Sequence, residues 1–132
     1  MAYASRTDLE SRYGATELLQ RESVLPAGAV DRALADADVE IDGYLATRYT
    51  VPLNPVPGNA TRVAAAIARY RLLGDAATDL ARKEYDDARA WLKDVAAGRV
   101  QINGATPLAS AAPAATVDYI VGRDKAFTGG LP

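Results

Sequence analysis

Cysteine and histidine are both missing from this sequence of 132 residues. Without cysteine the chain has neither a disulfide framework nor a thiolate metal site. Without histidine it lacks the usual general base at neutral pH and the commonest zinc ligand. The acidic residues follow helical spacing, and no segment has the pattern of a calcium-binding loop. We therefore expect no enzyme activity, no cofactor and no functional metal site, and a protein that acts through its surfaces.

Long apolar runs are missing as well. No stretch approaches the length that spans a membrane, and the N-terminus lacks the apolar run of a signal peptide. The formal net charge is −2, which argues against a general nucleic-acid binder. The sequence therefore predicts a soluble protein made in the cytoplasm, with no membrane partner.

Alanine supplies much of the 49% hydrophobic content, whereas aromatic residues supply only 7% of the chain. Alanine favours helix strongly but buries little area, so small and closely packed helices are expected. The pattern predicts one domain and an all-α fold: a small bundle of about five helices, two short and three longer, with an extended C-terminal arm.

Capping residues, glycines and prolines set the expected boundaries of the helices. The third helix carries an apolar stripe on one face and carboxylates on the other, and the fourth is apolar all round, which is typical of a central helix. The first helix has Thr7 as N-cap, with Glu10 as its capping-box partner, and ends at Gly14, and the second runs through Glu17 and stops before Pro26. The third covers residues 28–49, and the fourth has Asn59 as N-cap and ends at Gly74. The fifth begins at Thr78 or Asp79 and ends at Gly98, and Val100 and Ile102 after it could form one short strand.

The C-terminal part differs in kind from the helical part. We expect a helical core over residues 1–102 and an extended arm over residues 103–132, because the latter are rich in Ala, Gly, Pro, Thr and Ser. An arm with its own apolar anchors suits docking onto another subunit or protein, whereas the alternatives are that it folds back on its own core or stays in solution. The expected docking residues are Val117, Tyr119, Ile120, Val121 and Phe127.

Four segments resemble one family of proteins in their order and spacing. They are YASRTDLESRYG at residues 3–14, ALADADVEIDGYLATRY at 33–49, IARYRL at 67–72 and YDDARAWLKDVAAG at 85–98. Together they are similar to the small Mu-like phage neck proteins, the head–tail connector or adaptor family. The resemblance implies a helical virion subunit that forms a ring of about twelve copies beneath the portal protein of a tailed bacteriophage. The ring would dock the next neck protein, a stopper or tail terminator, and genomic DNA would pass through it without sequence-specific binding.

A ring subunit needs two complementary faces, and the acidic face of the third helix is one candidate. Its carboxylates could pair with arginines of a neighbouring copy, or line the DNA channel, or form an ordinary solvated surface. The expected subunit-interface residues are Asp31, Asp38, Asp42, Arg62, Arg69, Arg71, Arg82 and Arg89.

Two rival interpretations remain. Two short helices followed by a longer one suit a helix-turn-helix DNA-binding regulator, but the would-be recognition helix is acidic, and phosphates would repel it. The other rival is an enzyme subunit whose catalytic residues come from a partner, for which the sequence offers no positive sign. At the end of the third helix, Tyr44, Arg48 and Tyr49 suit either a stacking platform for nucleic acid or a packed helix end.

Overall fold

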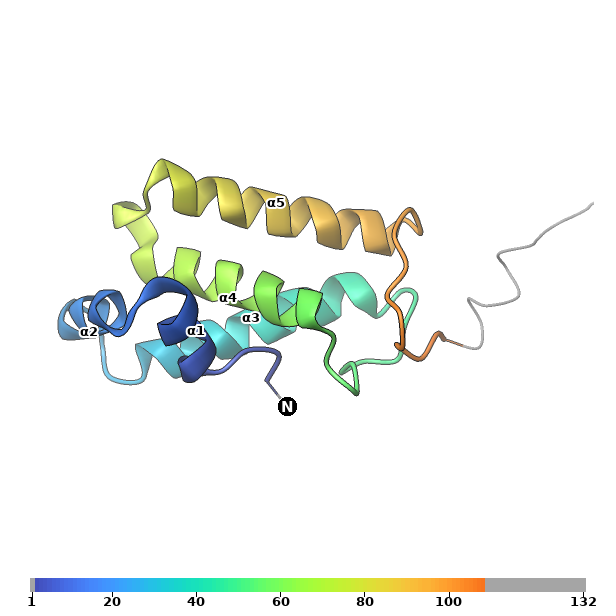
Figure 1. Cartoon of the computed structure of the whole chain (residues 1–132), viewed down its shortest axis with the longest axis horizontal. Helices are drawn as coiled ribbons and strands as arrows, with labels where there is room; N and C mark the ends of the chain where they lie inside the picture. Colours follow the sequence, from blue (N-terminus) through green and yellow to red (C-terminus); the bar gives the residue numbers. More distant parts are fainter. Residues whose placement is uncertain (1, 109–132) are drawn as a thin grey trace, which may run out of the picture.

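The computed structural model describes residues 2–108 of the chain. In order, the elements are α1 (Arg6–Tyr13), α2 (Ala15–Val24), α3 (Ala29–Leu45), α4 (Gly58–Leu73), the 3-10 turn η1 (Gly74–Ala76) and α5 (Asp79–Ala96). Within residues 2–108 there is no β-strand, and one isolated bridge joins Tyr49 to Pro107. The expected all-α bundle with two short and three longer helices is confirmed (Figure 1).

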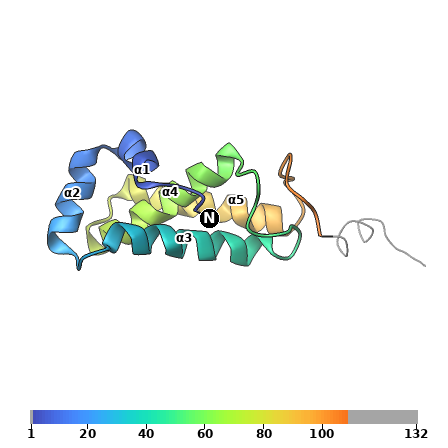
Figure 2. The same cartoon turned by 90° about the horizontal axis from the view of Figure 1, so that it is seen from below.

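The three longer helices form the body of the molecule. α4 packs against both α3 and α5, while α1 contacts α4 and α2 contacts α3. Figures 1 and 2 show α2, η1 and the start of α5 at one end of the bundle, which we call the α2 end. Residues 46–57 and 97–108 lie at the opposite end, which we call the exit end because the described chain stops there (Figure 1).

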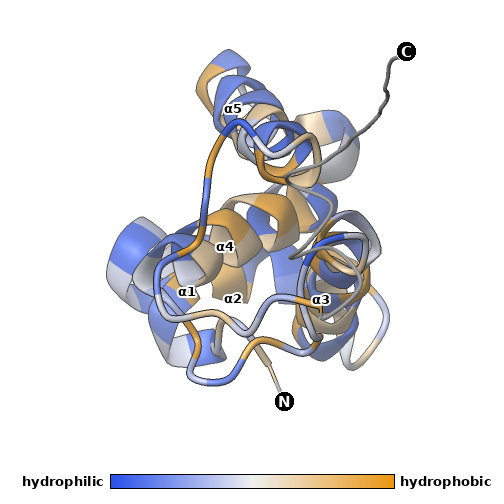
Figure 3. Cartoon of the chain, turned by 90° about the vertical axis from the view of Figure 1, so that its right-hand side faces the viewer, coloured by the Kyte–Doolittle hydropathy of each residue, from blue (hydrophilic) through white to orange (hydrophobic). Residues whose placement is uncertain are grey.

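α4 is the central helix, as its apolar sequence predicts. Its buried residues include Val63, Ile67 and a run of alanines, and in Figure 3 hydrophobic residues colour much of this helix orange where it lies between α3 and α5. Alanines at these contacts let the helices approach closely. No polar or charged residue of the described chain is classed as buried, so the core is apolar. No helix within residues 2–108 combines the length and apolar character needed to cross a bilayer.

Two expected N-caps are wrong. Ser5, not Thr7, caps α1: its side chain accepts from the Asp8 N–H, and the Asp8 carboxylate accepts from the Ser5 N–H. The helix begins earlier because burial of Tyr3 and Ala4 fixes the path of the chain before Ser5. Pro57, not Asn59, precedes α4, and its carbonyl accepts hydrogen bonds from the N–H groups of Ala60 and Thr61.

The expected extent of the third helix and the expected strand are also wrong. α3 ends at Leu45, because Tyr49 turns away to accept a hydrogen bond from the Ile102 N–H at 3.0 Å. That bond uses the N–H that a strand at Ile102 would need. Residues 103–108 then lie against the turn after α3, where Leu108 N–H donates to the Arg48 carbonyl at 3.0 Å. The rest of the expected arm lies outside the described residues.

Candidate functional site

Of the eight expected interface residues, four bind other parts of this chain, namely Asp38, Asp42, Arg69 and Arg71, and Arg89 lies near Tyr85 of its own helix. Asp31, Arg62 and Arg82 are exposed, and Arg82 has only a local pair with Asp79 at 3.4 Å. The role of all eight at a subunit interface stays a prediction. The expected docking residues of the arm, from Val117 to Phe127, lie outside the described residues.

Asp38 and Asp42 hold the N-terminal segment on α3. The Tyr3 N–H donates to Asp38 at 3.0 Å, and the Tyr3 hydroxyl donates to Asp42. The same hydroxyl accepts from the Leu53 N–H at 2.9 Å, and Thr61 donates to the Tyr3 carbonyl at 2.8 Å. One buried tyrosine therefore links the N-terminus to α3, to the proline-rich loop and to α4.

Burial raises the pKa of two groups in this cluster, the Asp38 carboxylate and the Tyr3 hydroxyl. Burial raises the pKa of Asp38, and the neighbouring charge of Asp42 raises it further, while the hydrogen bond from the Tyr3 N–H opposes the shift. The pKa of the Tyr3 hydroxyl is also raised, first by burial and then by its hydrogen bond to Asp42. Tyr3 is therefore a neutral hydrogen-bond donor at any physiological pH.

Arg69 joins α4 to both short helices and to α5. Its guanidinium binds Glu17 of α2 through two bonds of 3.0 and 3.1 Å and lies 3.4 Å from Glu84 of α5. It also stacks over the Tyr13 ring at 4.3 Å. The Tyr13 hydroxyl donates to Glu84, and burial together with that carboxylate raises the pKa of Tyr13 to about 12. Arg69 is only 14% exposed, which suits a structural role.

A second polar cluster lies across α3, α4 and α5. Glu40 accepts from Arg71 at 2.8 Å and from the Tyr85 hydroxyl at 3.4 Å. The Tyr85 ring stacks on Tyr70, with ring centroids 4.3 Å apart, and Arg89 lies 5.5 Å from its centroid on α5. Here an acidic residue of α3 pairs with an arginine, but the arginine belongs to the same chain.

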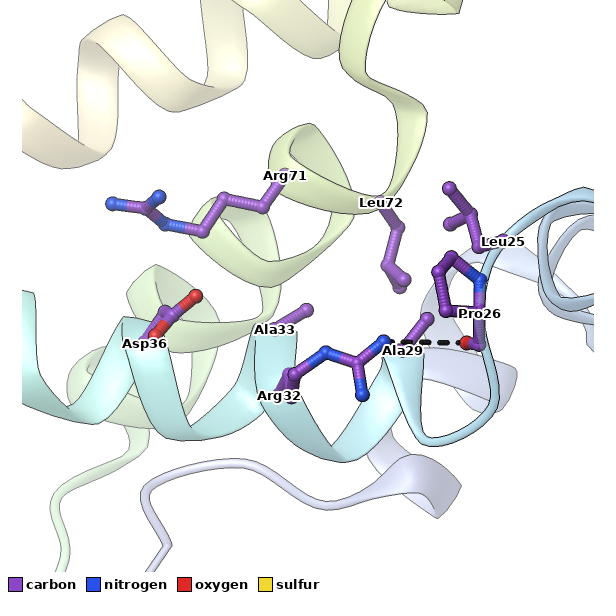
Figure 4. Close-up of a pocket in the computed structure, with 8 residues that line it drawn as sticks. All are labelled: Leu25, Pro26, Ala29, Arg32, Ala33, Asp36, Arg71 and Leu72. Carbon is purple, nitrogen blue, oxygen red and sulfur yellow. Dashed lines mark hydrogen bonds between the residues drawn. The ribbon is translucent and has the colours of Figure 1, made fainter.

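A shallow pocket of about 190 Å³ opens at the α2 end, between α2, α3 and α4. Leu72 of α4 and two alanines of α3 line its floor, and Leu25 and Pro26 close one side (Figure 4). Charged side chains stand at the other sides of the opening. The charged lining residues are Arg32, Asp36 and Arg71. A neighbouring hollow of about 460 Å³ shares Asp36 and Arg71 and extends toward Tyr85.

Arg32 fixes the wall of this pocket. Its guanidinium donates to the carbonyl of Ala27 at 2.7 Å and to that of Pro26 at 3.2 Å, which holds the turn between α2 and α3 (Figure 4). Gly28 in this turn has a φ of +82°, and a Cβ there would lie 3.2 Å from the Arg32 Nη1. The pocket is therefore bounded by a turn of defined shape.

Four large apolar side chains that sequence reasoning did not single out are mostly exposed. Leu19 and Val24 of α2 are 60% and 66% exposed, Val39 of α3 is 72% and Leu80 of α5 is 61%. Three of the four belong to α2 or the first turn of α5, at the α2 end. Helical spacing could have found Leu19, because its neighbour Leu18 takes the inward position. The pocket had no comparable signal, since its residues come from α3, α4 and the turn between α2 and α3.

Tyr44, Arg48 and Tyr49 do not form one exposed stack. Tyr49 is buried beneath residues 102–107, and the Arg48 guanidinium lies against Gly98 at the end of α5. Among residues 2–108 no three acidic side chains come together in a way that could hold a metal ion. The described surface carries exposed apolar side chains and a pocket with charged side chains at its opening.

These features define a small all-α bundle with an apolar core and charged clusters on its surface. The chain belongs to the family described as "Bacteriophage Mu, Gp36", whose model matches residues 3–119. It is 39% identical over 106 residues to the Mu-like prophage FluMu protein gp36 of Haemophilus influenzae, covering 76% of this chain and 74% of that protein. It is also 38% identical over 105 residues to gene product J of Escherichia phage Mu, covering 75% and 74% of the two chains. The expected membership of a Mu-like phage family is confirmed.

Proposed function

We propose that this chain is a head–tail connector of a Mu-like phage, an adaptor that joins the DNA-filled head to the tail. In this proposal about twelve copies form a ring in the neck of the virion. The ring binds the portal protein on one side and a stopper or tail-terminator protein on the other. Genomic DNA passes through its channel without sequence-specific contacts.

Membership of the Mu Gp36 family carries this proposal, because it ties the chain to tailed phages of the Mu type. The surface supports it. Asp38, Asp42, Arg69 and Arg71 have partners within the chain, and in this proposal apolar features of the surface add to the subunit contacts. The exposed Leu19, Val24 and Leu80 belong to elements at the α2 end and offer apolar contacts to a partner there. The exit end, where the C-terminal segment leaves, supplies a second and different face, as a closed ring of identical subunits requires.

Acidic residues on the outer side of α3 suit a channel or its rim. Asp31 and Asp36 are exposed on this helix, and a duplex would be repelled by them rather than held. The same feature disfavours the helix-turn-helix alternative, in which α3 would have to enter a DNA groove. Filter binding to random duplex at low salt separates the two functions. We expect no retention, and tight, salt-sensitive binding would favour the regulator.

Joining of heads to tails in vitro tests the connector function. Lysates of a phage that lacks the gene for this protein should contain DNA-filled heads and free tails as separate particles. Adding the purified chain should restore joined particles, which electron microscopy counts. The chain lacking residues 109–132 should keep its far-UV helicity but fail to co-sediment with portal protein. Joined particles in the absence of the protein would refute the proposal.

A further inference from the structure

We propose that the pocket between α2, α3 and α4 receives Tyr119 and its apolar neighbours from the C-terminal segment of a second copy of this chain. This inference rests on the proposed ring, because it supplies the contact between adjacent copies. It assigns an occupant to a pocket that the described residues line but leave open.

The pocket has the size and chemistry of a site for one large side chain. Its volume of about 190 Å³ corresponds to roughly six waters at ~30 Å³ each. Leu25, Ala29 and Leu72 line it with apolar surface, which gains from displacing that water. Arg32 and Asp36 at its rim are exposed and carry opposite charges, so the rim can pair with a segment that bears charges of both signs.

Residues 117–121 are the one segment beyond the described chain that combines β-branched and aromatic side chains in a run. In an extended segment Val117, Tyr119 and Val121 would share one side, so Tyr119 would enter the pocket while its neighbours cover the edges. Charge also matches. Arg123, on the same side of an extended segment as Tyr119, can meet Asp36 at the rim.

The position of the pocket, at the end of the bundle opposite Leu108, favours a neighbouring copy, and the length of the segment is enough to reach a pocket on the same chain or on a neighbour. Leu108 is held at the exit end by the Arg48 carbonyl, whereas the pocket lies beside the start of α3 at the α2 end. Tyr119 follows eleven residues after Leu108, a reach of about 36–40 Å at ~3.3–3.6 Å per residue. α3 itself, with 17 residues, is about 25 Å long. An arm that leaves one end and a pocket at the other end form a head-to-tail pair, the contact that closes rings.

Disulfide trapping in the full-length chain tests this proposal, since the sequence contains no cysteine of its own. One copy carries Asp36→Cys at the pocket rim, and a second, size-tagged copy carries Gly122→Cys beside the apolar segment. After mixing and mild oxidation, a non-reducing gel should show the mixed dimer. Asp86→Cys on the exposed side of α5 replaces Asp36→Cys in the matched control, and there the mixed dimer should be about tenfold less abundant.

A further substitution shows whether Tyr119 is the anchor. Tyr119→Ala in the Gly122→Cys copy should reduce the mixed dimer about tenfold, because burying an aromatic ring exceeds the 1.4 kcal/mol that a factor of ten represents. Tyr119→Phe should retain it. No mixed dimer above the Asp86 control would overturn the proposal. So would a disulfide-closed monomer, independent of dilution, in a single chain bearing both Asp36→Cys and Gly122→Cys, because the arm would then occupy its own pocket.

The trapping experiment uses isolated protein, whereas the connector function is measured by the joining of heads to tails. A negative trapping result with normal joining would remove the pocket contact and leave the connector proposal standing. A positive trapping result with no effect of the protein on joining would keep the contact and remove the connector.

Discussion

Tyr3 engages its backbone N–H, its backbone carbonyl and its hydroxyl in hydrogen bonds. The partners are Asp38, Thr61, Asp42 and Leu53, which belong to α3, α4 and the loop between them. Because the side chain is only 2% exposed, water cannot replace any partner that is lost. At the scale of single residues, this tyrosine therefore fixes the N-terminal segment more firmly than its place near the chain end would suggest.

Removing the Tyr3 hydroxyl should destabilise the fold. In Tyr3→Phe the Asp42 carboxylate and the Leu53 N–H lose a buried partner, so we expect the free energy of unfolding to fall by about 1–3 kcal/mol. Urea denaturation followed by circular dichroism measures the loss. Tyr70→Phe keeps the ring that stacks on Tyr85 and should change the stability by less than about 0.5 kcal/mol. Equal effects of the two substitutions would contradict the assigned role of the hydroxyl.

Asp38 should make stability depend on pH with an uncommon sign. Its pKa in the folded protein is raised above the ordinary value of 3.8, chiefly by burial. Between these two pKa values the folded state binds more protons than the unfolded state, so this group makes stability fall as pH rises through that window. Asp38→Asn keeps an oxygen that can accept from the Tyr3 N–H but cannot ionise.

The stability of Asp38→Asn relative to the original protein should therefore increase from pH ~3.8 upward and level off once Asp38 is ionised in both states. Urea titrations at a series of pH values give this difference. Asp36→Asn removes one exposed charge from the same helix and controls for the change in net charge. A difference between Asp38→Asn and the original protein that is flat across this range would show that burial does not strain the carboxylate.

At the scale of the elements, two glycines associated with α3 should respond to alanine with opposite signs. Gly28 precedes the helix with a φ of +82° and lies against Arg32, so Gly28→Ala should cost about 1–2 kcal/mol or more. Gly43 lies inside the helix with no neighbouring atom within 4 Å of an added Cβ, so Gly43→Ala should add about 0.5–1 kcal/mol. Thermal melts of the two variants check both signs. A stabilising Gly28→Ala would show that the turn relaxes easily.

The sequence predicted the number, order and approximate spans of the helices, because these follow from local periodicity and from glycines and prolines. The central place of α4 followed from its apolar residues in the same way. The helix ends were harder, since competing caps differ by contacts distant in the chain. Ser5 prevails over Thr7 because Tyr3 is buried against α3, and α3 ends early because Tyr49 binds the Ile102 N–H. Neither contact can be predicted from the spacing of residues within one helix.

The candidate site was predictable only in part, for the same reason. Charge spacing on α3 marked Asp38 and Asp42, which find partners within this chain, but spacing cannot tell a partner in another copy from one in the same chain. Arg71 of α4 reaches Glu40, and Tyr3 reaches Asp42, across more than thirty residues of sequence. The pocket joins Ala33 of α3 and Leu72 of α4 with Leu25 of the turn after α2, so it exists only once the bundle has formed.

At the scale of the whole molecule, the chain has two unlike ends. The α2 end carries the pocket and three exposed apolar side chains, while the exit end carries the residues that precede the C-terminal segment. Identical subunits with two unlike faces associate head to tail, and such contacts close only at a suitable rotation. The large apolar side chains exposed on residues 2–108 are all aliphatic, so the described surface lacks the exposed aromatic anchors from which strong interfaces draw much of their energy.

The isolated chain should therefore be a monomer or a weakly associating species, and the ring should close only on the portal. Light scattering over a concentration series should give a mass near that of one chain, and adding portal protein should produce the ring.

Leu19→Ser should leave the mass and the helicity of the free chain unchanged but weaken ring formation on the portal, because it removes an exposed apolar contact at the α2 end. Its exposed neighbour provides the matched control, since Gln20→Ser changes a polar side chain on the same helix. A stable closed ring without portal would mean that the contacts between copies are stronger than this surface accounts for.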